Sequence, residues 1–341
     1  MSNKNFKTIL DGLSVKHRAI NSSVLMVDGL NTFLRSFTVI NHVNTDGQHI
    51  GGLTGALKSI AYGIRISNPT YVIIVFDGVA SSTWRRNIYP EYKTNRHKNR
   101  ATNYDIFSSK EEEDQSVKDQ ITRLMQYLQC LPVSLISIDA TEADDIIGYL
   151  TSKFEKSPET ERVTIMSADR DFLQLASEKT RIYSPTKKKM YGPDEVLEEY
   201  GIPSHNFIMQ KILLGDVSDN IPGVVGLGPK KLLKFFPEVL EEKQYTINEI
   251  LLKSVDKIKE HKLYESICAF QHQLEINHKL MDLKNIQLSE ANEELVKEML
   301  SNKGTLNKYI FLRMYEKDKL GDSITNVTGW INDNFSYLDS L

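Results

Sequence analysis

The stretch YVIIVFD (residues 71–77) is a short apolar run, rich in β-branched side chains, that ends on an aspartate. Its length and composition predict a strand buried on both faces of a parallel sheet. The same pattern occurs three more times, at residues 24–28 (VLMVD), 135–138 (LISI) and 163–166 (VTIM). Helical periodicity occupies the segments between them, at residues 53–66, 117–128 and 143–154. This alternation predicts an α/β fold with a central, mostly parallel sheet flanked by helices.

The composition is that of an ordinary soluble globular protein, with 341 residues, 40% of them hydrophobic and 26% charged. That length suits two unequal lobes. No apolar run resembles a signal peptide or a membrane span, and two cysteines alone, Cys130 and Cys268, suggest reduced thiols. We therefore expect a cytoplasmic protein. A net charge of −3 argues against a strongly basic nucleic-acid binder.

Acidic residues follow each of the four predicted strands. Ligands of open α/β sheets bind beyond the carboxyl ends of the strands, so these acids should share one edge. Seven carboxylates are expected there: Asp28, Asp77, Glu142, Asp144, Asp145, Asp169 and Asp171.

Helix capping is the simpler explanation for any one of these groups. Thr141 is a good N-cap for the helix after the third strand, Ser167 or Asp169 suits the next, and acids in a first turn contribute about 0.3 to 1 kcal/mol each. Capping does not explain why four successive strands deliver acids to one edge. Crowded carboxylates repel one another unless cations neutralise them, and all-oxygen ligands suit Mg²⁺ or Mn²⁺. Two such ions about 4 Å apart hydrolyse phosphodiesters.

The spacing of the acids also suggests how they point. Glu142 and Asp145 lie three residues apart on one helical face, whereas Asp144 points elsewhere and suits a bridging position. Asp169 and Asp171, two apart in an extended or turning segment, project to the same side.

Residues 204–214 read as a helix ending at Gly215, followed by a glycine- and proline-rich stretch to Pro229 and a second helix at 230–236. This is a helix-hairpin-helix pattern. Gly226 and Gly228 permit close approach of the backbone, and Lys230 and Lys231 make the second helix suited to holding phosphate. An ordinary glycine-rich connection is the alternative. Asp216 and Asp219 in this stretch supply acids for a second metal ion.

Residues 84–100 carry six arginines and lysines against Glu91, interleaved with Trp84, Tyr89 and Tyr92. A solvated surface is the ordinary reading of such a run. Cations beside aromatic rings also suit phosphates and stacked bases of a single strand, and the neighbouring acids and hairpin favour that reading.

The chain resembles the 5′ nuclease or flap endonuclease superfamily, with a PIN-like core. The resemblance covers about residues 24–236 and rests on an ordered set of motifs: VDG with Asp28, VFDG with Asp77, WRRNIYPEYKTNR, TEADD, SADRDF and GDVSDNIPGVVGLGPKK. Within the superfamily it looks closest to the ribonucleases H of T-even-type phages, through WRR with YK-x-NR, SPTKKKMY and GWINDNFSYL. The resemblance implies three segments: an N-terminal extension at 1–23, the nuclease core at 24–203 with a basic arch at about 84–116, and a helix-hairpin-helix (helix-three-turn-helix) with a C-terminal helical DNA-binding lobe at 204–341.

The resemblance further implies a 5′ to 3′ exonuclease and flap endonuclease with ribonuclease H activity, removing RNA primers and 5′ flaps in phage replication. Its substrates would be RNA·DNA hybrids, duplex DNA and 5′-flap DNA. A monomer in the host cytoplasm would work beside a single-stranded-DNA-binding protein and a sliding clamp. The complete Gly226-x-Gly228 hairpin is more typical of other 5′ nucleases, and residues 1–23 have no counterpart in the family.

Carried over by position, Asp28, Asp77, Glu142 and Asp144 would hold a first Mg²⁺, and Asp144, Asp169, Asp171 and Asp216 a second, with Asp145 and Asp219 around them. Lys93 and Arg96 would contact the scissile phosphate. The nucleic-acid contacts would come from Arg85, Arg86, Tyr92 and Lys98 in the arch, and from Gly226, Gly228, Lys230 and Lys231 in the hairpin, where relatives also hold K⁺.

Two other classes of protein remain open at this point. A magnesium-dependent phosphatase of a small molecule also uses aspartates at strand ends, but it needs neither the hairpin nor the basic stretch. A non-catalytic nucleic-acid-binding protein on the same fold should have lost some of the acids, and none is missing.

Overall fold

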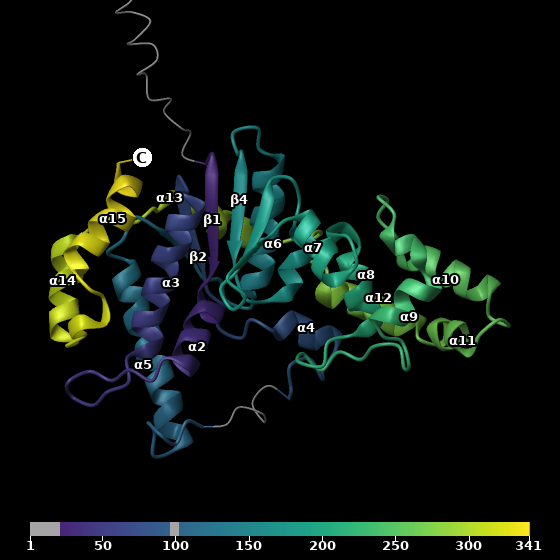
Figure 1. The fold of residues 1–341 in the computed structure, drawn as a ribbon, viewed down its shortest axis with the longest axis horizontal. Coiled ribbons are helices and arrows are strands. Elements are labelled where there is room, and N and C mark those ends of the chain that lie inside the picture. Colours follow the sequence, from purple (N-terminus) through teal and green to yellow (C-terminus); the bar gives the residue numbers. More distant parts are fainter. Residues whose placement is uncertain (1–20, 96–101, 341) are drawn as a thin grey trace, which may run out of the picture.

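The computed structural model describes residues 21–95 and 102–340, in which a six-stranded sheet carries helices on both faces (Figure 1). The strand order is β3-β2-β1-β4-β5-β6, with every pair parallel except β5 and β6. The strands are β1 Ser23–Asp28, β2 Tyr71–Val75, β3 Ser134–Ile136, β4 Arg162–Met166, β5 Thr180–Ser184 and β6 Lys189–Tyr191. The predicted α/β class is confirmed, and all four predicted strands are present.

The strand order reverses between β1 and β4, because the chain adds β2 and β3 on one side of β1 and then returns to place β4 on the other. Such a switch point opens a crevice at the carboxyl ends of the two strands. β1 ends at Asp28, and β4 is followed by Ser167. The topology therefore fixes where a ligand site can form.

The helices differ from the prediction mainly in their bounds. The α-helices of the nuclease core are α2 Gly29–Val39, α3 Gly51–Ser67, α4 Thr83–Ile88, α5 Lys110–Leu128, α6 Ala143–Lys156 and α7 Pro193–Tyr200. Those that follow are α8 Phe207–Leu214, α9 Pro229–Phe235, α10 Ile247–Asp256, α11 Lys262–Ala269, α12 Gln271–Met281, α13 Glu290–Ser301, α14 Lys308–Lys317 and α15 Val327–Asp339. Short 3₁₀ helices lie at η1 Arg170–Leu175, η2 Ser204–Asn206, η3 Pro237–Leu240 and η4 Gly321–Ser323.

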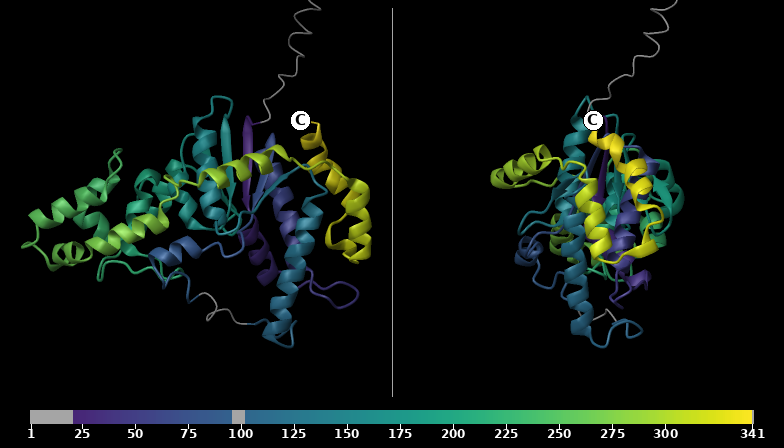
Figure 2. Two further views of the ribbon diagram at one scale, coloured as in Figure 1. Left: turned by 180° about the vertical axis from the view of Figure 1, so that it is seen from behind. Right: turned by 90° about the vertical axis from the view of Figure 1, so that its left-hand side faces the viewer.

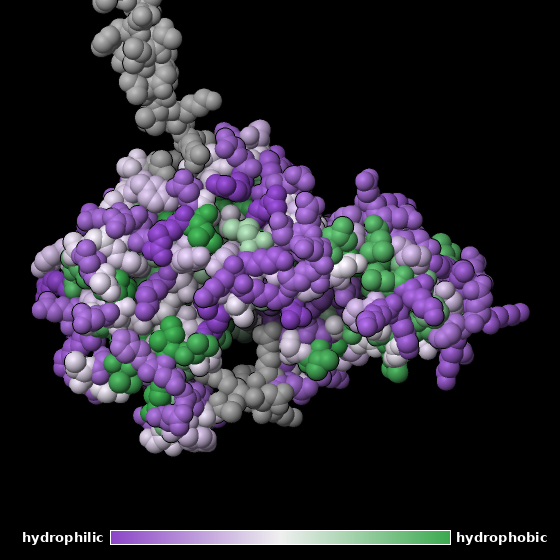
Figure 3. All heavy atoms as spheres, viewed as in Figure 1, coloured by the Kyte–Doolittle hydropathy of each residue, from purple (hydrophilic) through white to green (hydrophobic). Residues whose placement is uncertain are grey.

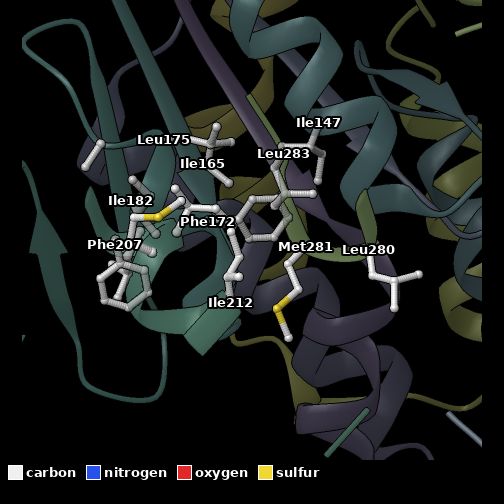
Figure 4. Packing of buried hydrophobic residues seen from close by; sticks show 14 of the residues in the cluster. Ile147, Ile165, Phe172, Leu175, Ile182, Phe207, Ile212, Leu280, Met281 and Leu283 are labelled. Atoms are coloured by element: carbon white, nitrogen blue, oxygen red, sulfur yellow. The ribbon is translucent and has the colours of Figure 1, made fainter. Parts of the chain in front are cut away.

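Side chains alternate along β1 and divide the interior into two cores. Val24 and Met26 face the core that contains α6 and η1, and Leu25 and Val27 face the one that contains α3 and α5. The first core continues beyond the sheet, since Phe172 of η1 lies among Ile212 of α8 and residues near the end of α12 (Figure 4). The sheet and α8 to α12 thus share one continuous core.

The chain after residue 204 takes two separate courses (Figure 2). Helices α8 to α12 extend from the β6 side of the sheet, whereas α13 packs on β3 and α15 packs on α3. Phe311 and Phe335 are fully buried in the core of α3 and α5. The segment expected as one C-terminal lobe therefore divides, because its last three helices cover the nuclease core.

Hydrophilic residues cover most of the face seen in Figure 3, and hydrophobic residues gather in patches over α9 to α11. None of the described helices combines the length and apolar character that a membrane crossing requires.

Candidate active site

Asp28 lies at the switch point, and both of its carboxylate oxygens accept hydrogen bonds. Its Oδ1 accepts a hydrogen bond from the Asn31 backbone N (3.0 Å), which caps α2, and its Oδ2 accepts one from Ser167 Oγ beyond β4 (2.9 Å). The pKa of Asp28 is raised to about 7, chiefly by burial; the nearby carboxylates of Asp169 and Asp77 add to this rise, and the two hydrogen bonds oppose it. Sequence reasoning missed both residues as partners of Asp28: Ser167 lies inside the SADRDF motif, whereas Asn31 lies two residues beyond the VDG motif.

The other acids after the strands converge on the same place. Asp77 Oδ1 accepts a hydrogen bond from the Ala143 backbone N at the start of α6 (2.8 Å), and Asp169 caps η1 by accepting from the Asp171 N (2.8 Å). Burial raises the pKa of Asp144 well above its ordinary range, with Asp169 and Asp28 adding to the effect. Several acids therefore cap helices and also crowd one another, so helix capping and a metal site do not exclude each other as explanations of these acids.

Asp171 and Asp216 share a cation that the sequence did not indicate. Lys211 of α8 places its Nζ 2.7 Å from Asp171 Oδ1 and pairs with Asp216 Oδ2 as well. The pKa of Asp171 is raised to about 7, chiefly by burial and then by Asp169, although Lys211 opposes this rise. The pKa of Asp216 stays lowered, because Lys211 outweighs its burial. The only signal in the sequence is a single lysine within the apolar helix FIMQKILL.

Glu142 is buried between two cations from the arch. Lys93 Nζ lies 2.8 Å from its Oε1, and Arg85 Nη1 lies 2.8 Å from its Oε2. Burial alone would raise the pKa of Glu142, but Arg85 and Lys93 more than offset it and the pKa is lowered. Glu142, rather than the predicted Thr141, is the residue at the N-cap of α6.

The position of Arg85 contradicts the prediction that this residue contacts nucleic acid. It is 2% exposed, so it does not offer its guanidinium to nucleic acid from the surface. Instead it donates to both oxygens of Asp145 (2.8 and 2.6 Å), while Trp84 Nε1 donates to Asp145 Oδ2 (3.0 Å). Asp145 thus faces Arg85 and Trp84, and its expected place around a metal ion stays a prediction.

Tyr92 was also predicted to contact nucleic acid, but its ring is 3% exposed and is not open to a terminal base. Its hydroxyl donates to Glu142 Oε2 (3.1 Å). The next residue, Lys93, has a φ of 58°, a left-handed conformation that costs about 1 to 3 kcal/mol in a non-glycine residue. The Lys93 N donates to the Asp219 carbonyl of the hairpin (2.9 Å), which helps to hold that conformation.

The hairpin contacts the base of the arch, and the tip of the hairpin is exposed. Asn95 Nδ2 donates to Asn220 Oδ1 (2.9 Å), and Asn220 Nδ2 donates to the Glu91 carbonyl (3.0 Å). Gly226 has a φ of +80°, and open space surrounds both it and Gly228. Lys231 Nζ donates to the Gly226 carbonyl (2.7 Å), whereas Lys230 and Arg86 are exposed. The other three cations of residues 84–100 lie outside the described residues: Arg96, Lys98 and Arg100.

Within residues 21–95 and 102–340, no three carboxylate, imidazole or thiol groups form a ready-made set of metal ligands. Lys93, Lys211 and Arg85 occupy carboxylate oxygens of Glu142, Asp171, Asp216 and Asp145.

Comparison with known families identifies the family to which this chain belongs. The family described as "5'-3' exonuclease, N-terminal resolvase-like domain" matches residues 23–201, the segment that carries the sheet and most of the acids. The chain belongs to the 5′–3′ exonuclease family. It is accordingly an enzyme, a phosphodiester hydrolase, and the small-molecule phosphatase and the non-catalytic protein are set aside.

Two relatives illustrate the range of the family. The 5'-3' exonuclease of Aquifex aeolicus is 29% identical over 274 residues, covering 79% of this chain and 86% of its own. DNA polymerase I of Bacillus subtilis is 30% identical over 255 residues, 73% of this chain, but this chain spans only 26% of that longer protein. The match to the polymerase thus concerns about a quarter of its length.

A solved structure of the bacteriophage T5 D15 flap endonuclease, described as a pseudo-enzyme-product complex with DNA and metal ions, matches with a TM-score of 0.65 at 20% identity. The match covers 86% of this chain and 99% of the T5 protein, and it shows a shared fold. These comparisons establish membership of the 5′–3′ exonuclease family, and they do not extend to a T-even phage branch of it.

Proposed function

We propose that this exonuclease hydrolyses nucleic-acid strands from or near their 5′ ends with two divalent cations held at the β1/β4 switch point. The crowding of buried acids carries the proposal. Burial and neighbouring carboxylates raise the pKa of Asp28 and Asp171 to about 7, and that of Asp144 well above its ordinary range. Acids whose charge the protein itself does not fully compensate become good ligands once a hard cation neutralises them.

The donor set fits Mg²⁺ or Mn²⁺, because it consists of carboxylate oxygens. We assign Asp28, Asp77, Glu142 and Asp144 to the first ion, and Asp144, Asp169, Asp171 and Asp216 to the second, with Asp219 nearby. Bound there, such a pair of ions supplies an activated water and stabilises the leaving oxygen of a phosphodiester.

The lysines of the site have a distinct part in this proposal. Lys93 and Lys211 compensate the charge of Glu142, Asp171 and Asp216 through ion pairs. When cations take over that compensation, the Lys93 ammonium is free to approach the scissile phosphate. A positive charge there stabilises the charge that develops in the transition state.

We further propose that the substrates are duplex DNA, 5′-flap DNA and RNA·DNA hybrids, as for the ribonucleases H of T-even-type phages. The support is the motif order together with the DNA in the complex of the T5 protein. In this proposal the core is residues 24–203, and the hairpin, with Gly226, Gly228, Lys230 and Lys231, holds the uncut strand, together with a K⁺ ion. A single-stranded-DNA-binding protein is the proposed partner.

The test compares a labelled RNA·DNA hybrid with a 5′-flap DNA, each with and without Mg²⁺. The wild-type protein should release short 5′ products only with the cation. Asp169→Ala should abolish release and leave binding in EDTA largely intact, and Asp169→Asn should do the same while keeping an N-cap for η1. Asp333→Ala, on an exposed turn of α15, is the matched control and should cleave normally. Cleavage by Asp169→Asn at the wild-type rate would rule out the proposed site.

A further inference from the structure

A cavity of about 430 Å³ lies between α2, α3, the end of β4 and the β5–β6 hairpin, outside the carboxylate cluster. Four cationic side chains line it, and no acid does: Arg35, Lys58, Arg65 and Lys188. None of the four forms an ion pair with a carboxylate in the described part of the chain. The cavity therefore gathers positive charge in a protein whose net charge is −3.

Arg35 has donors to spare inside this cavity. Its Nη2 donates to Ser59 Oγ (2.9 Å), but its Nε is buried and has no hydrogen-bond partner among the described residues. Burial lowers the pKa of Arg35, and the nearby Tyr183 offsets this effect only in part. Buried donors of this kind are normally satisfied, and a charged acceptor makes the strongest bond to a guanidinium.

An aromatic surface adjoins the cations. The rings of Tyr62 and Tyr183 lie 5.8 Å apart at an interplanar angle of 39°, and Arg65 lies 5.7 Å from the Tyr62 ring. Tyr183 is buried, whereas Tyr62 is 42% exposed and presents a face to solvent. Cations beside an exposed aromatic ring suit a phosphate and the base attached to it.

We propose that this cavity binds a phosphate-bearing nucleotide unit at a position separate from the cleavage site. The proposal rests on the proposed function, since a nucleic-acid substrate or a mononucleotide product supplies such a unit. Met166 in the cavity wall directly precedes Ser167, whose hydroxyl contacts Asp28. The end of β4 therefore borders both the cavity and the carboxylate site.

The test reverses two exposed charges, Lys58→Glu with Lys188→Glu. Fluorescence anisotropy measures binding of a 5′-flap DNA in EDTA between 50 and 200 mM KCl, and calorimetry measures binding of deoxyadenosine monophosphate. We expect about a tenfold or greater loss of DNA affinity and a shallower salt dependence, because each lost phosphate contact removes about 0.9 from the slope of log K against log[salt]. The control Lys156→Glu with Lys308→Glu changes the charge equally at two exposed lysines elsewhere and should leave both measurements unchanged.

The outcomes distinguish a mononucleotide product from a nucleic-acid strand as the ligand. They also distinguish failure of this inference from failure of the proposed nuclease mechanism. Loss of mononucleotide binding with unchanged DNA affinity would identify a product site, and loss of DNA affinity a strand site. Wild-type values for both ligands would overturn the inference. Since these measurements contain no divalent cation, failure of the protein to cleave would refute the nuclease mechanism and leave this inference standing.

Discussion

Replacing Arg85 by alanine is expected to lower the free energy of unfolding by about 3 to 5 kcal/mol, the usual cost of removing one partner from a buried ion pair. Arg85 donates to Glu142 (2.8 Å), to both oxygens of Asp145 (2.8 and 2.6 Å) and to the Leu280 carbonyl (2.9 Å). The three charged side chains are at most 3% exposed. Alanine would leave Asp145 without a cation and Glu142 with Lys93 alone, so a cost within this range is expected.

Urea unfolding followed by circular dichroism measures the loss. Arg86→Ala is the matched control, because Arg86 is exposed and makes one long bond of 3.4 Å, so its replacement should cost less than about 0.5 kcal/mol. Adding Asp145→Asn to Arg85→Ala should recover part of the loss, since it removes one stranded charge. A loss below about 1 kcal/mol, or strict additivity in the double variant, would refute the view that Arg85 holds these acids in place.

Two further predictions concern the charges of the site. Lys93→Ala should slow the single-turnover cleavage step about 100-fold while changing DNA affinity little, and a change confined to affinity would contradict its role at the scissile phosphate. Without divalent cations, the free energy of unfolding should fall as pH rises from about 5 to about 8. The raised pKa values of Asp28 and Asp171, about 7 against an ordinary 3.8, make the native state bind more protons than the unfolded state across that window. Asp28→Asn should flatten this slope in urea titrations, Mg²⁺ should restore stability most at pH 8, and stability that rises with pH would disprove the assignment.

The spacing of acids in the sequence predicted geometry better than it predicted roles. Glu142 and Asp145 were expected on one helical face, and both do contact the same group. That group is Arg85, which lies 57 residues from Glu142 in the sequence. The spacing of two residues on one helix therefore did not reveal that Arg85 is the partner that their face meets.

The sequence also did not predict the short polar strands. β5 and β6 were not predicted, since TRIYS and KMY lack the continuous apolar runs of β1, β2 and β4. They become strands because β4 offers β5 an edge to pair with, and β5 then offers an edge to β6. Pairing with an existing sheet, rather than local propensity, decides such segments.

The sequence by itself determined the α/β class, the buried strands and the delivery of acids to one edge of the sheet. These follow from hydrophobic runs and from the position of each acid just after a strand, which are local properties of the chain. Only the tertiary structure decided that Lys211 joins Asp171 to Asp216, that Arg85 is buried, and that four cations from α2, α3 and the β5–β6 hairpin line one cavity. Each of these depends on which side chains meet after distant segments pack, and burial then sets their charges through desolvation.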